Sequence, residues 1–259
     1  MHLSFLSIII LLLIVIIDRL FLKEHYQSVM TTWIAQMNIE FVAEPIVNLD
    51  EKMLGVELLT RFTDENARVI SPEWVIAGWS AELKRSFLNE QFSQINHHAQ
   101  WFDKHGLFCS VNIDHTMAVL LLNDAVLQSS LESFPFVTLE ITEHFPNLEQ
   151  GIQNPVLRGL KSEGFSLWLD DLGAGNANVA ALVSGCFDVV KLDRCFFREQ
   201  IQKPTFSILI SNIKKYCNKI VIEGVEDRQY INLLRGEDIW GLQGYLFKSA
   251  PFHRVETLL

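Results

Sequence analysis

Cysteine is scarce in this sequence, with four residues in 259. None of them belongs to a C-x-x-C pair, and four are too few for a disulfide framework in a chain of this length. We therefore expect the main part of the chain to lie in the cytoplasm, with reduced thiols at Cys109, Cys186, Cys195 and Cys217.

Positive charge is also in deficit. Lys and Arg total 21 against 31 Asp and Glu, which leaves a formal net charge of −10 at pH 7. A protein that grips a phosphate backbone usually carries a basic patch, so the balance argues against duplex nucleic acid as a partner. Repeats, proline-rich linkers and charge blocks are absent too. With 49% hydrophobic residues, the chain is expected to form one large domain with a sizeable core.

One long hydrophobic run is present, at the amino terminus. Residues 3–17 are apolar apart from two serines, and as a helix they would reach about 22 Å. Extension to residues 3–22 allows a tilted or interfacial membrane anchor, and the cationic residues Arg19, Lys23 and His25 after the run would keep the remainder in the cytoplasm. Alternatively, Met30 is the true start. We predict a hydrophobic helix in residues 1–29, either an anchor or an over-extended reading frame, and a catalytic domain in residues 30–259.

From residue 38 onward, short runs rich in β-branched and aromatic residues alternate with longer amphipathic ones. The expected strands are residues 38–47, 54–62, 107–113, 136–142, 165–171, 187–193, 219–225 and 242–247. The expected helices include residues 81–104, 116–131, 148–163, 198–217 and 227–235. Eight strands in this alternation predict a modified (β/α)8 barrel of the TIM type. Because residues 48–53 are too few for a crossover helix, the first strand should be antiparallel to the second.

Charged and amide residues recur where these strands end, which is the face that carries active sites in barrels. They are Glu57, Arg61, Asn112, Glu140, Glu143, Asp170, Asp171, Lys191, Glu223 and Gln243. Any one of them can be a strand-end cap or a satisfied ion pair, but so many in apolar strands indicate chemistry.

The charge of this group points to metal. Two cations, Arg61 and Lys191, do not balance the five carboxylates Glu57, Glu140, Asp170, Asp171 and Glu223. The excess negative charges would repel one another in the partly desolvated mouth of the barrel. Two divalent cations would offset them, and an all-oxygen ligand set favours Mg²⁺ or Mn²⁺. Adjacent Asp170 and Asp171 can bridge a metal pair, an arrangement that suits phosphodiester hydrolysis.

Seven ordered elements of the sequence resemble the EAL-domain family of bacterial cyclic di-GMP phosphodiesterases, over roughly residues 38–252. They are Glu57 to Arg61 (ELLTR), Val111 to Ile113 (VNI), Leu139 to Glu143 (LEITE), Asp170 to Gly175 (DDLGAG), Val190 to Asp193 (VKLD), Ile222 to Glu226 (IEGVE) and Gln243 to Tyr245 (QGY). The resemblance implies a barrel whose first strand is antiparallel. It also implies hydrolysis of cyclic di-GMP to linear pGpG, a homodimer, and a part in motility, fimbriae and biofilm.

The resemblance also implies roles for single residues. One metal would be held by Glu57, Asn112, Glu140 and Asp170, and the second by Asp170, Asp171 and Glu223. Lys191 would orient or deprotonate the attacking water, with its pKa lowered beside two cations, and Gln243 would bind near Glu223 and that water. Arg61, with Leu59 and Asp193, would contact the substrate, and Glu143 would brace the loop that begins at Asp170. A guanine base needs a stacking surface, for which Phe62 and Phe247 are candidates.

The loop after Asp171 departs from the family. It reads DDLGAGNAN where the family usually has DDFGTGYSS, so an aromatic residue and a threonine hydroxyl are replaced at Leu172 and Ala174, while no metal ligand is lost. A catalytic phosphodiesterase is the first hypothesis. The altered loop keeps open a second, a non-hydrolysing module that binds cyclic di-GMP or a protein partner. A third, hydrolysis of another phosphodiester on the same barrel, is not excluded by the residue types.

Overall fold

The computed structural model describes residues 37–142, 144–174 and 178–259. The predicted hydrophobic helix, the boundary at residues 29 and 30, Glu143 and part of the altered loop lie outside these residues. Within them, no helix combines the length and the apolar character that crossing a membrane requires.

Two compact units make up the described chain. The smaller comprises residues 37–40 and 61–80, and the larger comprises residues 41–60 and 81–259. The smaller unit contains β3 (Val69–Ile70), which pairs antiparallel with the end of β2, and α2 (Pro72–Ala77), which is capped by the Ser71 hydroxyl. Its core is the fully buried Phe62, whose ring meets Trp79 edge-on at 5.5 Å.

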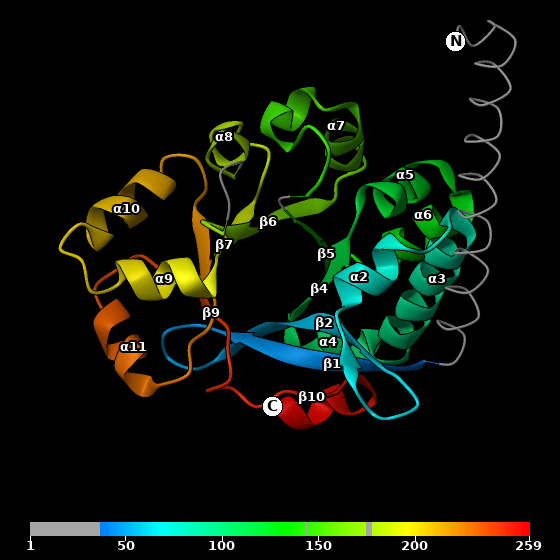
Figure 1. Ribbon diagram of the computed structural model, residues 1–259, viewed down its shortest axis with the longest axis horizontal. Coiled ribbons are helices and arrows are strands. Elements are labelled where there is room, and N and C mark those ends of the chain that lie inside the picture. The colour runs from blue at the N-terminus through cyan, green and yellow to red at the C-terminus, as the bar shows by residue number, and fades with distance from the viewer. Residues whose placement is uncertain (1–36, 143, 175–177) are drawn as a thin grey trace, which may run out of the picture. The chain divides into compact units, whose positions relative to one another are not determined.

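Eight strands close into a barrel, as the sequence predicted (Figure 1). In order around it they are β1 (Asn38–Val47), β2 (Met53–Thr63), β4 (Phe108–Ile113), β5 (Val137–Ile141), β6 (Ser166–Leu172), β7 (Val189–Leu192), β8 (Lys219–Ile222) and β9 (Gly241–Leu242). From β2 to β9 the neighbours are parallel, whereas β1 is antiparallel to β9. The antiparallel first strand is therefore confirmed.

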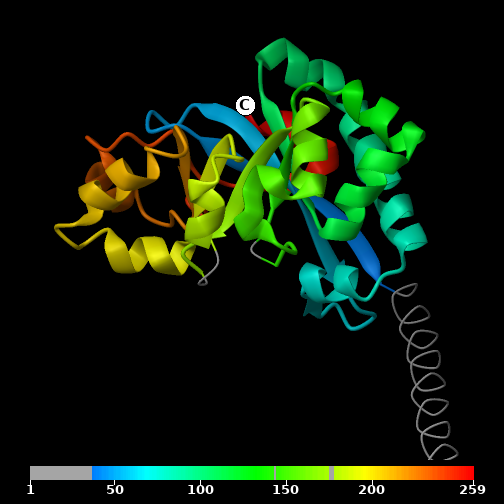
Figure 2. The same cartoon turned by 90° about the horizontal axis from the view of Figure 1, so that it is seen from above.

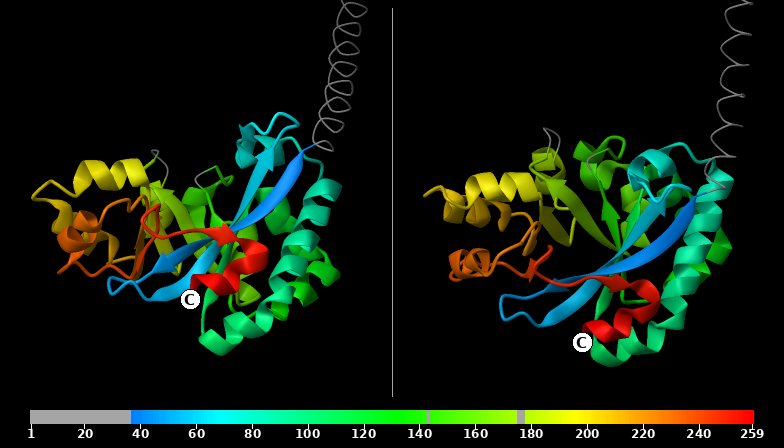
Figure 3. Two further views of the ribbon diagram at one scale, coloured as in Figure 1. Left: turned by 90° about the horizontal axis from the view of Figure 1, so that it is seen from below. Right: turned by 60° about the horizontal axis from the view of Figure 1, so that its bottom comes forward.

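A short turn explains that direction. Asn48 begins the turn, and its side-chain oxygen accepts hydrogen bonds from the backbone amides of Asp50 and Lys52. The turn returns the chain directly into β2, with which β1 pairs. At Val42 and Ala43, nearer its amino end than its pair with β9, β1 also pairs with β10 (Ala250–Pro251), so the carboxyl-terminal segment, red in Figure 3, runs beside the blue β1.

Helices of the larger unit lie outside the parallel strands (Figure 2). They are α3 (Ala81–His97), α4 (Ala99–His105), α5 (His115–Asn123), α6 (Ala125–Glu132), α7 (Pro155–Ser162), α8 (Asn178–Val183), α9 (Arg194–Gln200), α10 (Phe206–Ile213) and α11 (Arg228–Leu234), with the 3-10 segments η1 (Leu148–Gln153) and η2 (Phe252–Leu258).

Four of the predicted helices are each divided into two pieces, and in two of them a polar side chain caps the second piece. Asp124 accepts hydrogen bonds from the amides of Val126 and Leu127, which ends α5 and starts α6. Asn154, followed by Pro155, starts α7 in the same way. Residues 242–247 were predicted as a strand, but only Gly241–Leu242 pair, and the chain then turns away at Gly244, where φ is +147°.

The barrel interior is layered, because side chains on a strand alternate between its two faces. Trp168, Val189 and Val221 belong to one apolar cluster with Ile46. Phe108 and Trp240 pack against this cluster, and their rings stack with centroids 5.6 Å apart. Two positions further along β6, β7 and β8, the same inward face carries polar residues. The polar layer therefore packs directly on the apolar layer.

Candidate active site

The polar layer consists of Asp170, Lys191 and Glu223, each two residues beyond its partner in the apolar cluster, with Glu57, Asn112 and Glu140 from neighbouring strands. Parallel pairing aligns Asn112 of β4 with Glu140 of β5. These side chains lie in, or directly after, six different strands, so closure of the barrel is what brings them together.

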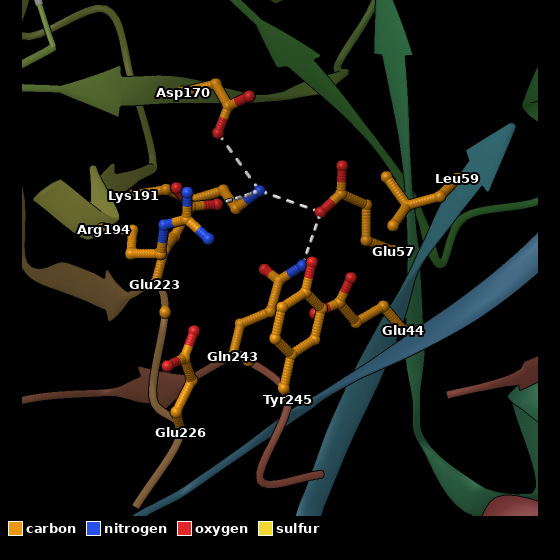
Figure 4. A pocket seen from close by; sticks show the side chains of 12 residues that line it. Glu44, Glu57, Leu59, Asp170, Lys191, Arg194, Glu223, Glu226, Gln243 and Tyr245 are labelled. Carbon is orange, nitrogen blue, oxygen red and sulfur yellow. Dashed lines mark hydrogen bonds and ion pairs between the residues drawn. The ribbon is translucent and has the colours of Figure 1, made fainter. Parts of the chain in front are cut away.

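The ammonium group of Lys191 is the centre of the site (Figure 4). It donates hydrogen bonds to Glu57 Oε2 at 2.9 Å and to Glu140 Oε2 at 2.8 Å. It also forms ion pairs with Asp170 Oδ1 at 3.1 Å and Glu223 Oε1 at 2.8 Å. Lys191 is 1% exposed. One buried cation therefore serves four carboxylates.

Two amide side chains complete the contacts of Glu57. Asn112 Nδ2 donates to Glu57 Oε1 at 2.5 Å, and Gln243 Nε2 donates to Glu57 Oε2 at 2.7 Å. Burial alone would raise the pKa of Glu57, but the charge of Lys191 and the hydrogen bonds from Gln243, Lys191 and Asn112 outweigh it and lower that pKa. Glu57 is therefore held as a carboxylate.

The other carboxyl groups are shifted the opposite way. Burial, followed by the negative charge of Glu57, raises the pKa of Glu140 well above its usual value. Burial also raises the pKa of Asp170, and it raises that of Glu223 to about 8. For Lys191, burial lowers the pKa, but the four surrounding carboxylates raise it well above its ordinary value. The lowered pKa expected for Lys191 referred to a site that holds two cations; with the carboxylates alone it is a firmly held ammonium.

Asp171 reaches the site through a distortion of β6. Strict alternation would turn it away from Asp170, but the pairing of β6 with β7 shifts register between Leu169 and Leu172, and Asp171 has a positive φ of 56°. As a result, Asp170, Asp171 and Glu223 each offer a carboxylate oxygen within 4.8 Å of the others, a group suited to holding a metal ion.

The donor set passes a simple test for a hard cation. Glu140 Oε1 and Gln243 Oε1 are buried and have no hydrogen-bond partner among the described residues. Buried oxygens without partners are costly unless something absent from the protein chain binds there. The ligands are all oxygens, and Lys191 is the only cation within 4.0 Å of the four carboxylates in the part of the chain described. Mg²⁺ or Mn²⁺ fits this environment.

Four further residues that the sequence predicted for the site lie in different places. Leu59 lines the same pocket. Asp193 caps α9, accepting a hydrogen bond from the Phe196 amide at 2.8 Å, and does not line it. Arg61 belongs to the smaller unit, so its contact with substrate stays a prediction. Phe62 is wrong as a stacking surface, because it is buried against Trp79.

Besides two glycines, the sequence did not predict four residues that line the pocket with their side chains, Glu44, Arg194, Glu226 and Tyr245. Glu44 comes from the antiparallel strand β1, and its role needs the closed barrel. The other three had a signal in the sequence, because Arg194 directly follows the motif VKLD, Glu226 ends IEGVE and Tyr245 ends QGY, and each motif contains a predicted site residue. Arg198 of α9 ties one of these elements in place by donating to Gly224 O at 3.3 Å and pairing with Glu226 at 2.6 Å.

Comparison with known proteins supports the motif reading. The family model of the EAL domain matches residues 27–250. Over 220 residues the chain is 32% identical to the putative anti-FlhC(2)FlhD(4) factor YdiV of Escherichia coli K12, covering 83% of this chain and 92% of that protein. It is 28% identical over 223 residues to the cyclic di-GMP phosphodiesterase PdeH of the same organism, covering 83% and 85%. The crystal structure of the EAL-like domain protein YdiV superimposes with a TM-score of 0.79 at 29% identity, covering 86% of this chain and 97% of that one.

Proposed function

The chain belongs to the EAL-domain family, and from that premise we propose that it is a metal-dependent phosphodiesterase that hydrolyses cyclic di-GMP to linear pGpG. The observation that carries the proposal is that four buried carboxyl groups surround Lys191, while Asp170, Asp171 and Glu223 each offer an oxygen within 4.8 Å of the others. The similarity to PdeH supports the substrate.

Two divalent cations, Mg²⁺ or Mn²⁺, are proposed for this site. Glu57, Asn112, Glu140 and Asp170 would hold one, and Asp170, Asp171 and Glu223 the other. When bound, such ions supply a water nucleophile at neutral pH and stabilise the charge that develops on the phosphoryl oxygens.

The side chains of the protein have separable tasks. Without metal, Lys191 keeps its proton, since four carboxylates raise its pKa. In the metal-loaded site we assign it to the attacking water, which it would orient by hydrogen bonding or deprotonate. Gln243 holds Glu57 from the side of β9, and Glu57 in turn holds Asn112. These bonds fix the directions of three groups before substrate arrives, which reduces the cost of ordering the site.

We also propose a cellular setting for the reaction. The four cysteines are free thiols, which suits a catalytic domain in the cytoplasm. A homodimer, attachment to the inner membrane through residues 3–22, and a part in motility, fimbriae and biofilm stay predictions.

The test is single-turnover hydrolysis of cyclic di-GMP by the full chain, with Mg²⁺, with Mn²⁺ and with EDTA. We expect pGpG only when metal is present, and a loss of at least 100-fold in rate, the scale of removing one well-placed catalytic group, for Glu57→Gln. Glu132→Gln changes an exposed carboxylate on α6 and should leave the rate unchanged. Intact substrate with wild-type protein, under conditions where PdeH cleaves it, would refute the proposal.

A second candidate function is binding without hydrolysis. The 32% identity to an anti-FlhC(2)FlhD(4) factor favours it, as does the altered loop that starts at Leu172. On this alternative, the wild-type chain would bind cyclic di-GMP, or an FlhC–FlhD complex in size-exclusion chromatography, and yield no pGpG. The same protein sample answers both questions.

A further inference from the structure

The pocket above the polar layer is too small to enclose a whole dinucleotide. Its cavity is about 250 Å³, below the range of about 300 to 1,000 Å³ in which drug-sized ligands are buried. If the scissile phosphate lies against the carboxylates, part of the substrate must extend over the rim of the pocket. Among the lining residues, Arg194, Glu226 and Tyr245 are exposed and so form that rim, while Glu44 is half-buried.

Tyr245 is the aromatic residue of the pocket lining, and its side chain faces solvent. It is 78% exposed, the most exposed large hydrophobic residue among those described. Figure 4 shows its ring among the side chains that line the pocket, in front of Gln243 and Glu44 in that view. A ring this exposed contributes little to the core, and because it also lines the pocket it is accessible to a bound ligand.

The loop that carries Tyr245 is held firmly. Val225 N donates to Gln243 O at 3.0 Å and Leu246 N donates to Val225 O at 3.0 Å, so the loop is bonded on both sides of the tyrosine. Between them, Gly244 approaches so closely that an added Cβ would lie 2.4 Å from Val225 N. The ring therefore projects from a fixed backbone, two residues from Gln243.

We propose that Tyr245 is the stacking platform for a purine base of the substrate, an inference that rests on the proposed function. A flat π face on a rigid loop, beside a site that binds the phosphodiester, is the surface on which a nucleobase stacks. Such a contact is worth about 1 to 3 kcal/mol per base. The two stacking candidates that the sequence suggested are less suitable, because Phe62 is buried and Phe247 is only partly exposed and does not line the pocket.

The test compares Tyr245→Phe and Tyr245→Leu in the full chain with Mn²⁺. Leucine keeps apolar bulk but removes the π face, so KM for cyclic di-GMP should rise about 5- to 150-fold, the equivalent of that stacking free energy. Because the platform lies away from the carboxylates, kcat and the Mn²⁺ concentration for half-maximal activity should stay within about twofold. Phenylalanine keeps the face and should retain the wild-type KM. Tyr216→Leu, at an exposed tyrosine outside the pocket, is the matched control.

Binding of fluorescent cyclic di-GMP, measured by anisotropy, separates this inference from the proposed function. If wild-type protein binds but does not cleave, the same ratios between variants are expected in Kd. Wild-type protein that binds or cleaves while Tyr245→Leu is equally effective would overturn the stacking platform alone. Wild-type protein that does neither would overturn both.

Discussion

Replacing Lys191 with methionine should destabilise the metal-free protein strongly, and divalent metal should reverse much of the loss. Methionine is similar in length but has no charge, so four carboxylates would lose their shared cation while the packing space stays filled. No other change removes so many ion pairs of the described site at once.

The magnitude follows from the distances. At separations of 2.8 to 3.1 Å and an effective dielectric constant of about 20, each contact attracts by about 5 to 6 kcal/mol before desolvation. Desolvation of buried ions cancels most of this, and removal of one partner of a buried pair typically costs about 3 to 5 kcal/mol. For a chain of this size that loss corresponds to a fall in Tm of roughly 6 to 20 °C.

The assay is thermal unfolding of wild type and Lys191→Met in EDTA and in excess Mn²⁺. Metal should raise the Tm of the variant more than that of the wild type, because the cations replace the missing charge. Lys84→Met is the control: Lys84 is also buried, but it pairs with the single carboxylate of Asp114, which is partly exposed. The Tm of Lys84→Met in EDTA should fall less than that of Lys191→Met, and Mn²⁺ should raise it by as much as it raises the Tm of the wild type. Equal Tm values for Lys191→Met and wild type in EDTA would refute the reasoning.

Two further predictions concern Glu223 and Gly244. The pKa of Glu223 in the folded protein, about 8, lies above its ordinary value of 4.5, so its contribution to stability is complete below about pH 4.5 and is lost as pH rises through 8. In EDTA, the Tm of Glu223→Gln should therefore equal that of the wild type near pH 5 and be higher than it near pH 9. Curves of Tm against pH that run parallel for the two proteins would contradict this. Gly244→Ala should lower the free energy of unfolding by about 1 to 3 kcal/mol, because the new Cβ would lie 2.4 Å from the Val225 backbone and φ is +147°. Gly106→Ala is the control and should lower it less, because nothing lies within 4 Å of that Cβ. Equal losses of the two variants in urea titrations would show that crowding is not the cause.

Much of the fold was open to prediction because its signals are local. β-branched and aromatic runs marked seven of the eight barrel strands within a few residues, and the short turn at Asn48 indicated the direction of β1. The division of helices was not predicted, since Asp124 and Asn154 are ordinary polar residues on an amphipathic pattern until their side chains bond to the next amides. The last predicted strand was overextended because the paired ladder ends at Leu242.

For the site, too, some features follow from the local sequence and others only from the tertiary structure. The spacing of residues along each strand determined by itself which side chains share the inward face, as with Trp168 and Asp170 in β6, because alternation is a property of any strand. The closed barrel decided what those faces do together: it placed one ammonium among four carboxylates and so set their pKa values in opposite directions. The tertiary structure also decided that Asp171 reaches the site through a register shift, and that Tyr245 rather than Phe62 is exposed at its rim. These outcomes depend on contacts between residues up to 186 positions apart, such as Gln243 with Glu57, and no local pattern encodes them.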